Sequence, residues 1–150
     1  MTTLSRWGLN ALAVVLTVAL LHQVTAREFA SAEEVHEHNA HIEAVISEAA
    51  ERYGVSGRLL RCIAWHESKT RIDWLNMSYY NPEAVGDYGA SLGLVQLHRN
   101  GLRPHFYQVG YVNPFDPWES ADYLARAVSG EWRSQGVGVW HWTTWRANCS

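Results

Sequence analysis

Hydrophobic residues recur at helical spacing in two neighbouring stretches of the chain. The first stretch runs from Glu33 to Tyr53, and Gly54 after it is a residue type that commonly ends a helix. Ser56 is then placed to cap a second helix, which extends from Gly57 to about Ser68. Four residues of this second stretch share one face at i, i+3, i+4 and i+7: Leu60, Ile63, Ala64 and Glu67. The pattern therefore predicts two consecutive helices, the second of which directs a carboxylate toward the interior.

A third helix begins at a strong capping sequence. Asp116 can cap this helix, Pro117 suits its first position, and Glu119 stands at the third. Gly136 and Gly138 end the helical pattern. The apolar face of the predicted helix consists of Ala121, Leu124, Ala125, Val128 and Trp132.

Turn-forming residues fill the segments between the predicted helices. Residues 69–92 contain Asn81-Pro82 and the pair Gly86 and Gly89, which are typical of loops and tight turns. Residues 93–98 regain an apolar character, and residues 99–113 again predict a loop. The sequence as a whole predicts one small, mostly α domain with a short loop or β-hairpin region.

The first 26 residues differ from the rest of the chain and have the three-part layout of a secretory signal peptide. They carry one basic residue, Arg6, then an apolar run over residues 11–21, then Val24-Thr25-Ala26, whose small residues suit a signal peptidase. We therefore expect residues 1–26 to be a signal peptide and residues 27–150 to form the folded domain. The chain would then be exported to the periplasm or the cell surface. The alternative is a retained membrane anchor over residues 7–23, although its apolar run is shorter than the ~20 residues a span needs.

Composition and charge fit a globular domain with no affinity for nucleic acid. Of the 150 residues, 47% are hydrophobic and 18% are charged, which excludes a disordered chain. Without residues 1–26 the chain loses one of 12 basic residues and none of 15 acidic ones, so its formal charge is 11 − 15 = −4. A nucleic-acid binder needs a basic patch, and this balance argues against one.

Two cysteines, Cys62 and Cys149, fall in the predicted mature part. An even number of cysteines in an exported chain favours a disulfide, which would pin the C-terminus to the helix that carries Glu67. Two free buried thiols are the alternative.

Glu67 is the leading candidate for a catalytic residue. On an inward helical face a carboxyl group loses water, which disfavours its charged form and raises its pKa. A carboxylic acid that stays protonated near neutral pH can act as a general acid, and protonating a glycosidic oxygen requires such a group. The alternative is an ordinary glutamate in the last turn of a helix that reaches solvent.

The sequence around Glu67 resembles the soluble lytic transglycosylases and goose-type lysozymes. The resemblance runs from about residue 42 to residue 98 and rests on ordered motifs. They are Glu67-Ser68, Asn81-Pro82-Glu83-Ala84 and Gly93-Leu94-Val95-Gln96, preceded by "YGVSGRLLRCIAWHES". It implies a lysozyme-like fold whose β-hairpin region lies beside an active-site cleft.

The resemblance also implies roles for individual residues. Glu67 would be the catalytic acid, and Ser68 would position it or a sugar substituent. Gly93 and Gln96 would shape the floor of the cleft, with Gln96 contacting the sugar. No cofactor and no metal are implied.

The chain departs from the transglycosylase pattern in two places. The late Ala-Tyr-Asn-x-Gly motif is absent, and residues 136–149, "GVGVWHWTTWRANC", resemble instead the Trp-rich tail of resuscitation-promoting factors. Those factors tie a C-terminal cysteine to the catalytic helix, which supports a Cys62–Cys149 pair. The second departure is Asp87, because goose-type lysozymes have an Asp at this place that is thought to hold the attacking water. Asp87 could equally be a turn residue, and Asp73 is a second candidate partner without motif support.

Aromatic and histidine residues supply further candidates. Flat aromatic rings stack on sugars, and five of them flank the predicted site: Trp74, Tyr79, Tyr80, Trp140 and Trp142. Trp132 and Trp145 are expected in the core. His38 and His41 stand at i, i+3 near His36, but a solvated helix face explains them better than a metal site. His66 points to another face than Glu67 and is not expected to be catalytic.

The sequence therefore predicts a lytic transglycosylase that cleaves the β-1,4 bond between N-acetylmuramic acid (MurNAc) and N-acetylglucosamine (GlcNAc) in peptidoglycan. Its partners would be glycan strands, and we expect a monomer; a partner in a cell-envelope machine stays open. One alternative is a hydrolytic muramidase that uses Asp87. Two others are a glycan-binding module without turnover and a surface protein that uses its tryptophans for protein contacts.

Overall fold

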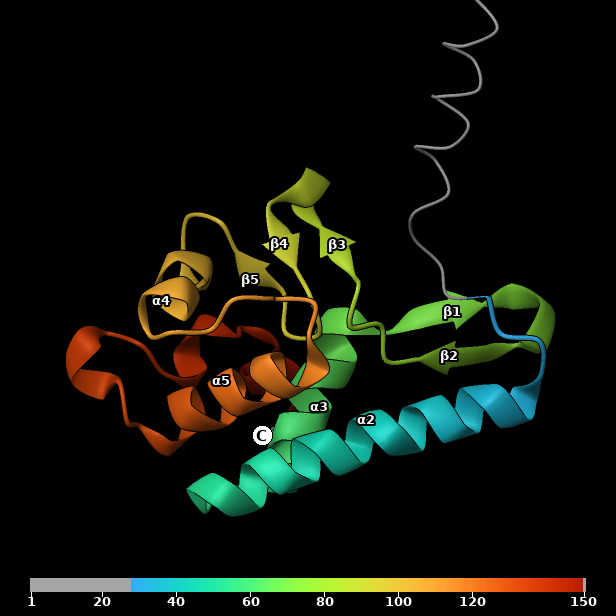
Figure 1. The fold of residues 1–150 in the computed structure, drawn as a ribbon, viewed down its shortest axis with the longest axis horizontal. Helices are drawn as coiled ribbons and strands as arrows, with labels where there is room; N and C mark the ends of the chain where they lie inside the picture. The colour runs from blue at the N-terminus through green and yellow to red at the C-terminus, as the bar shows by residue number, and fades with distance from the viewer. Residues whose placement is uncertain (1–27, 150) are drawn as a thin grey trace, which may run out of the picture.

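The fold is described by a computed structural model for residues 28–149 (Figure 1). The predicted signal peptide over residues 1–26 lies outside these residues. Within them, no helix has the length and apolar character needed to cross a membrane.

Four α-helices form the main elements of the described chain. They are α2 (Ala32–Tyr53), α3 (Gly57–Ser68), α4 (Leu102–Gln108) and α5 (Pro117–Ser129). The long helix α2 packs against both α3 and α5 (Figure 1). The predicted mostly α class, with a short β-hairpin region, is confirmed.

The strands are short and form two antiparallel sheets. The hairpin of β1 (Thr70–Ile72) and β2 (Met77–Tyr79) turns at η1 (Asp73–Leu75) and lies along the N-terminal half of α2 (Figure 1). The second sheet has the order β3-β4-β5, and η2 (Asp87–Gly89) joins its first two strands. Its strands are β3 (Val85–Gly86), β4 (Ser91–Leu92) and β5 (Leu97–His98).

The caps that the sequence predicts are present. Ser56 accepts a hydrogen bond from the amide of Leu59 at the start of α3, and Asp116 accepts two from the first turn of α5. Gly54 adopts a left-handed conformation with φ 63° after α2. The predicted starts of α3 and α5 are thus confirmed, and α2 begins one residue before the predicted Glu33.

Two predicted boundaries are wrong. Residues 99–113 were expected to be a loop but contain α4, which places Leu102 and Phe106 in the core. A short helix with two buried residues has too little periodicity to be seen in sequence. The helix over α5 was expected to continue to Gly136, but it ends at Ser129 because Gly130 takes φ 86°. The chain then continues through η3 (Arg133–Gln135) and η4 (Val139–His141) to a π-helical turn, η5 (Trp145–Cys149).

One hydrophobic core holds α2, α3 and α5 together. Ile46, Leu60, Ile63 and Leu124 are all fully buried in it. Each such side chain stabilises the fold by about 1.5–3 kcal/mol relative to exposure. Because Leu60 and Ile63 fix the rotation of α3, Glu67 on the same face is directed inward as well.

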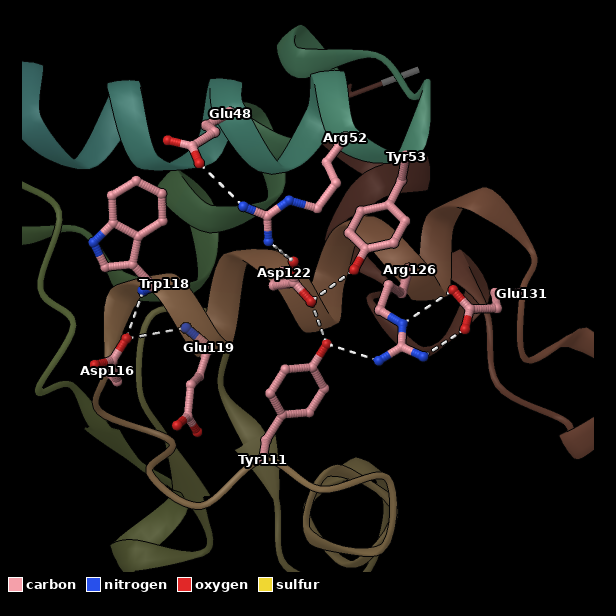
Figure 2. A network of polar contacts seen from close by, with 10 residues as sticks. All are labelled: Glu48, Arg52, Tyr53, Tyr111, Asp116, Trp118, Glu119, Asp122, Arg126 and Glu131. Atoms are coloured by element: carbon pink, nitrogen blue, oxygen red, sulfur yellow. Dashed lines mark hydrogen bonds and ion pairs between the residues drawn. The ribbon is translucent and has the colours of Figure 1, made fainter.

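A polar network joins α2 to α5 on the side shown in Figure 2. Asp122 of α5 accepts hydrogen bonds from Arg52 at 2.7 Å, from Tyr53 at 2.9 Å and from the hydroxyl of Tyr111. Arg126, one turn further on, pairs with Glu131 (Figure 2). The network anchors the C-terminal end of α2 and the loop before α5, so the frame that carries α3 is fixed by polar as well as apolar contacts.

The C-terminus is joined covalently to α3. Cys62 and Cys149 form a disulfide with their Cα atoms 5.7 Å apart and a sequence separation of 87. The predicted pairing is therefore present, and the alternative of two free thiols is wrong.

Candidate functional site

Glu67 lines a polar cavity of about 380 Å³. The residue occupies the last turn of α3 and is half-buried. Its neighbours come from four separate segments, so the cavity forms only when the chain is folded. The lining residues are Glu67, Gly86, Asp87, Ser91, Gln96, His98, Gly101, Leu102, His141, Trp142 and Thr143.

The surroundings of Glu67 favour its neutral form. Burial raises the pKa of the Glu67 carboxyl above its ordinary value, and the nearby negative charge of Asp87 raises it further. A hydrogen bond from Thr144 and the charge of His66 lower this pKa, but burial is the larger effect. Glu67 therefore keeps its proton to a higher pH than a solvated glutamate does.

Thr144 makes the one direct polar contact to the Glu67 carboxyl that is found among the described residues. Its hydroxyl lies 2.6 Å from Oε1 of Glu67 and donates a hydrogen bond to it. Thr144 belongs to the C-terminal segment, 77 residues away in sequence. The contact fixes Oε1 and leaves Oε2 for another partner.

Asp87 faces the same cavity from η2. Its backbone has φ 49°, in the left-handed region, and the next residue, Tyr88, has φ 54°. Oδ2 of Asp87 accepts a 2.7 Å hydrogen bond from the hydroxyl of Ser91, which is itself buried. The side chain is thus oriented by β4 rather than by its own turn. Two consecutive non-glycine residues in this region store strain, which is often found at functional sites.

Gln96 lines the cavity. Its Nε2 donates hydrogen bonds to the carbonyl oxygens of Ala84 at 3.2 Å and Gly93 at 2.9 Å. A Cβ on Gly86 would overlap Oε1 of Gln96, so a larger residue there would displace the amide. The amide is therefore held by the backbone, with Oε1 against β3.

Gly93 shapes the site indirectly. It does not line the cavity; it takes φ 81°, and a Cβ would overlap the carbonyl oxygen of Pro114. The close approach holds the loop before α5 against the strand region that carries Gln96.

We expect Gly93→Ala to destabilise the domain by about 2 to 5 kcal/mol, the sum of left-handed strain and overpacking. Gly89→Ala is the matched control, because Gly89 has φ 89° but a Cβ there would meet no heavy atom of the described residues within 4 Å. Denaturant unfolding of both variants separates the two effects. Equal losses of unfolding free energy in the two variants would show that the close contact with Pro114 does not contribute to the effect of Gly93→Ala.

The structure does not bring all the predicted sugar contacts to the cavity. Trp142 lines it, and its Nε1 donates a 2.8 Å hydrogen bond to the carbonyl oxygen of Val95. Ser68 is buried and its hydroxyl donates to the carbonyl oxygen of Ala64, so it faces neither the cavity nor the Glu67 carboxyl. Tyr79 and Tyr80 are buried in the two hydrophobic clusters, beside Phe29 and Trp65 respectively. Apolar packing explains these two tyrosines, which sequence proximity alone had placed at the site.

The remaining candidates also lie away from the cavity. Trp74 is 68% exposed on the β1–β2 hairpin, and Trp140 is 40% exposed. Trp132 is buried, as predicted, and Trp145 is partly buried against the core. Asp73 is exposed in an ion pair with Arg71. His66 is on α3 but outside the cavity lining.

The histidines near the start of α2 have structural surroundings. His36 and His41 are exposed, whereas His38 is buried, with Nε2 2.7 Å from the carbonyl oxygen of Tyr80. Over residues 28–149, no group of three or more His, Cys, Asp or Glu side chains is placed to hold a metal ion.

Sequence reasoning missed several residues of the site, and three of them carry polar side chains beside Glu67 or in the cavity lining: Thr144, His98 and His141. Thr144 has no motif and becomes visible only when the tail folds against α3. His98 and His141 line the cavity from β5 and η4. A usable signal for His98 was its position just after the Gly93–Gln96 motif. A usable signal for His141 was its position beside Trp142.

In comparisons with known proteins, the chain matches no family model and no curated protein sequence.

Proposed function

We propose that this protein is a lytic transglycosylase that cleaves the MurNAc-β-1,4-GlcNAc bond of peptidoglycan, with Glu67 as general acid and then general base. The observation that carries the proposal is the half-buried Glu67 carboxyl, with its raised pKa, in the lining of a cavity of about 380 Å³. The resemblance of residues 42–98 to soluble lytic transglycosylases and goose-type lysozymes supports the substrate class.

In the first step, protonated Glu67 gives its proton to the glycosidic oxygen as the bond from that oxygen to C1 of MurNAc breaks. GlcNAc leaves with a free 4-hydroxyl. Positive charge develops at C1, and the carboxylate formed at Glu67 lies close to it. Oε1 is held by Thr144, so Oε2 carries the proton.

In the second step, the 6-hydroxyl of the same MurNAc attacks C1. The Glu67 carboxylate takes the proton of that hydroxyl, which returns the enzyme to its starting state. The product is a 1,6-anhydro-MurNAc end, and no water is consumed. One carboxyl group therefore serves both steps.

A second candidate, hydrolysis, is favoured by the position of Asp87. Its side chain faces the same cavity as Glu67 and is oriented by Ser91. Such a carboxylate could hold and activate a water molecule on the far face of the sugar, as inverting glycosidases do. The product would then have a reducing end.

Product mass separates the two reactions. The mature protein is incubated with purified peptidoglycan, and the soluble muropeptides are weighed. We expect anhydro-muropeptides, one water lighter than hydrolysed ones. Reducing-end products would instead make Asp87 the base and the protein a muramidase.

Asp87→Asn is expected to leave the products anhydro and to move the basic limb of the pH–activity profile to lower pH. The reason is that Asp87 raises the pKa of Glu67, and neutralising it removes that repulsion. Asp73→Asn is the matched control, because Asp73 is exposed outside the cavity. A loss of roughly 100-fold or more with Asp87→Asn alone would support the hydrolytic alternative.

Two non-enzymatic alternatives predict different results. A glycan-binding module would bind peptidoglycan without releasing muropeptides. A surface protein that uses its tryptophans for protein contacts would not bind glycan at all. A sedimentation assay with insoluble peptidoglycan, run beside the product assay, distinguishes them.

We also propose that the chain acts outside the cytoplasm, where its substrate lies. The disulfide supports an oxidising compartment. Export is tested by locating the protein in cell fractions. Removal of the predicted signal peptide is tested by the mass of the secreted form.

A further inference from the structure

A disulfide and a side-chain hydrogen bond are among the contacts that join α3 to the C-terminal strap, which we define as residues 139–149. The disulfide links Cys62 to Cys149, and the hydroxyl of Thr144 donates to Oε1 of Glu67. Cys62 and Glu67 are five residues apart on α3, and their partners Thr144 and Cys149 are five residues apart on the strap. The strap therefore runs antiparallel to the end of α3, with a covalent contact at one point and a hydrogen bond to the candidate acid at the other.

The two ends of the strap are held by different contacts, and its C-terminal end, η5, packs on α3. Trp142 fixes its N-terminal part through the bond to Val95. Beyond Thr144, residues 146–148 are exposed, and Asn148 donates only within the strap, to the carbonyl oxygen of Thr144. Trp145 packs against the core, but its buried Nε1 has no hydrogen-bond partner among the described residues. Chain ends fray unless they are tied down, and the disulfide is the covalent restraint that secures the packing of η5 on α3.

We propose that Thr144 is the positioning residue of Glu67 and that the Cys62–Cys149 disulfide holds Thr144 in place, so that the site is fully assembled only in the oxidised chain. The inference rests on the proposed function of Glu67 as the acid. It assigns Thr144 and the disulfide a role in activity in addition to stability.

Thr144 acts on Glu67 in two ways. Its hydroxyl fixes Oε1, so that the free rotation of the carboxyl is lost and Oε2 faces the substrate. It also donates a hydrogen bond to the carboxylate, which stabilises the charged form and opposes the effect of burial. The acid is thereby kept able to release its proton in the first step.

Other titratable groups also surround Glu67. They are His66 on α3, Asp87 on η2, His98 on β5 and His141 on η4. None of them lies on the end of the strap beyond Thr144, so a change confined to Thr144 leaves all four in place.

The redox step balances with a dithiol as the reductant. The dithiol gives two electrons and two protons to the disulfide, its own sulfurs become a disulfide, and Cys62 and Cys149 become thiols. The strap is then free at its C-terminal end, and Thr144 no longer stays beside Glu67. In a reducing cytosol the chain would accordingly hold an unassembled site until export.

Thr144→Val tests the positioning role while keeping the disulfide and the side-chain volume. We expect kcat to fall by roughly 10- to 100-fold, as misplaced catalytic groups do, with little change in KM. We also expect the basic limb of the pH–activity profile to move to higher pH, because the hydroxyl that lowers the pKa of Glu67 is gone. Thr144→Ser should restore both. A loss that is equal at all pH values and is not rescued by Ser would show a merely structural role and overturn the proposal.

A second readout does not depend on activity. The titration of the Glu67 carboxyl is followed by carbon NMR in the mature protein, with its signal assigned by its absence in Glu67→Gln. We expect the pKa to rise in Thr144→Val and to return in Thr144→Ser. If it rises while no variant releases muropeptides, the proposed function fails and the positioning role stands. If it does not rise, the positioning role is wrong whatever the activity.

The role of the disulfide is tested on the same protein before and after treatment with dithiothreitol. Circular dichroism verifies that the reduced chain is folded at the assay temperature. We expect the folded reduced chain to show the same loss and the same pH shift as Thr144→Val, and to recover on reoxidation. Reduction should cause no further change in the activity or the pH–activity profile of Thr144→Val. A folded reduced chain with unchanged activity and an unchanged Glu67 titration would overturn the link between the disulfide and the acid.

Discussion

Glu67→Gln is expected to reduce the rate of muropeptide release by roughly 100- to 10,000-fold, the range that general acid catalysis contributes. The amide has nearly the same shape as the carboxyl group but no proton to transfer at neutral pH. It also cannot serve as the base that takes the proton of the 6-hydroxyl. Both steps are lost together, so the residual rate should not depend on pH in the range where the wild-type enzyme titrates.

The fold should survive this substitution. Glu67 lines the cavity, and burial disfavours its charged form. Gln removes that unfavourable charge, so we expect the free energy of unfolding to stay equal or to increase. Glu51→Gln is the matched control, because Glu51 is exposed on α2 and does not line the cavity. Equal activity of Glu67→Gln and Glu51→Gln would show that Glu67 is not the acid.

Removing the disulfide is expected to have the second large effect. A cross-link across 87 residues restricts the unfolded chain by about 4 to 5 kcal/mol in the loop-entropy model. A domain of this size has only about 5 to 15 kcal/mol of stability in total. The Cys62→Ala/Cys149→Ala variant should therefore be marginally folded, with a melting temperature lower by roughly 15 to 25 °C.

Thermal unfolding of the variant, of the oxidised protein and of the reduced protein measures this effect. The variant and the reduced wild-type chain should melt at similar temperatures. A change of less than about 1 kcal/mol in either would mean that the unfolded chain is already compact around these positions. The stability loss is a separate quantity from the activity loss expected for Thr144→Val, which keeps the cross-link.

The helices of this domain were predictable because their signals are local. Ser56 and Asp116 accept the hydrogen bonds that their types and positions predict, and Gly54 ends α2. Helix α4 was not predictable, because only Leu102 and Phe106 are buried over its seven residues. The early end of α5 depends on the backbone of Gly130, and the apolar pattern through Trp132 concealed it.

The candidate site was predictable in part. Glu67, Asp87, Gln96 and Trp142 were all proposed from the sequence, and they line one cavity. Ser68 follows Glu67 in the sequence but does not line the cavity. Its hydroxyl donates a hydrogen bond to the carbonyl oxygen of Ala64 in the same helix. Residue spacing along a helix fixes the face of a side chain, but proximity in sequence does not.

The contact of Thr144 with Glu67 could not have been found from sequence. It joins residues that are 77 positions apart, and it depends on how a tail without regular α-helix packs on α3. The disulfide was the only sequence signal that brought the tail to this helix. Knowledge of that pairing limits where the tail lies, but not which side chain reaches the carboxyl group.

The pH dependence of muropeptide release tests the central claim most directly. If Glu67 is a desolvated acid, activity falls as the pH rises through its folded-state pKa, and that pKa lies above the ordinary value of about 4.3. The limb must be absent from the residual activity of Glu67→Gln and present in Glu51→Gln. A falling limb at the ordinary value, or one that persists in Glu67→Gln, would show that the proton comes from another group.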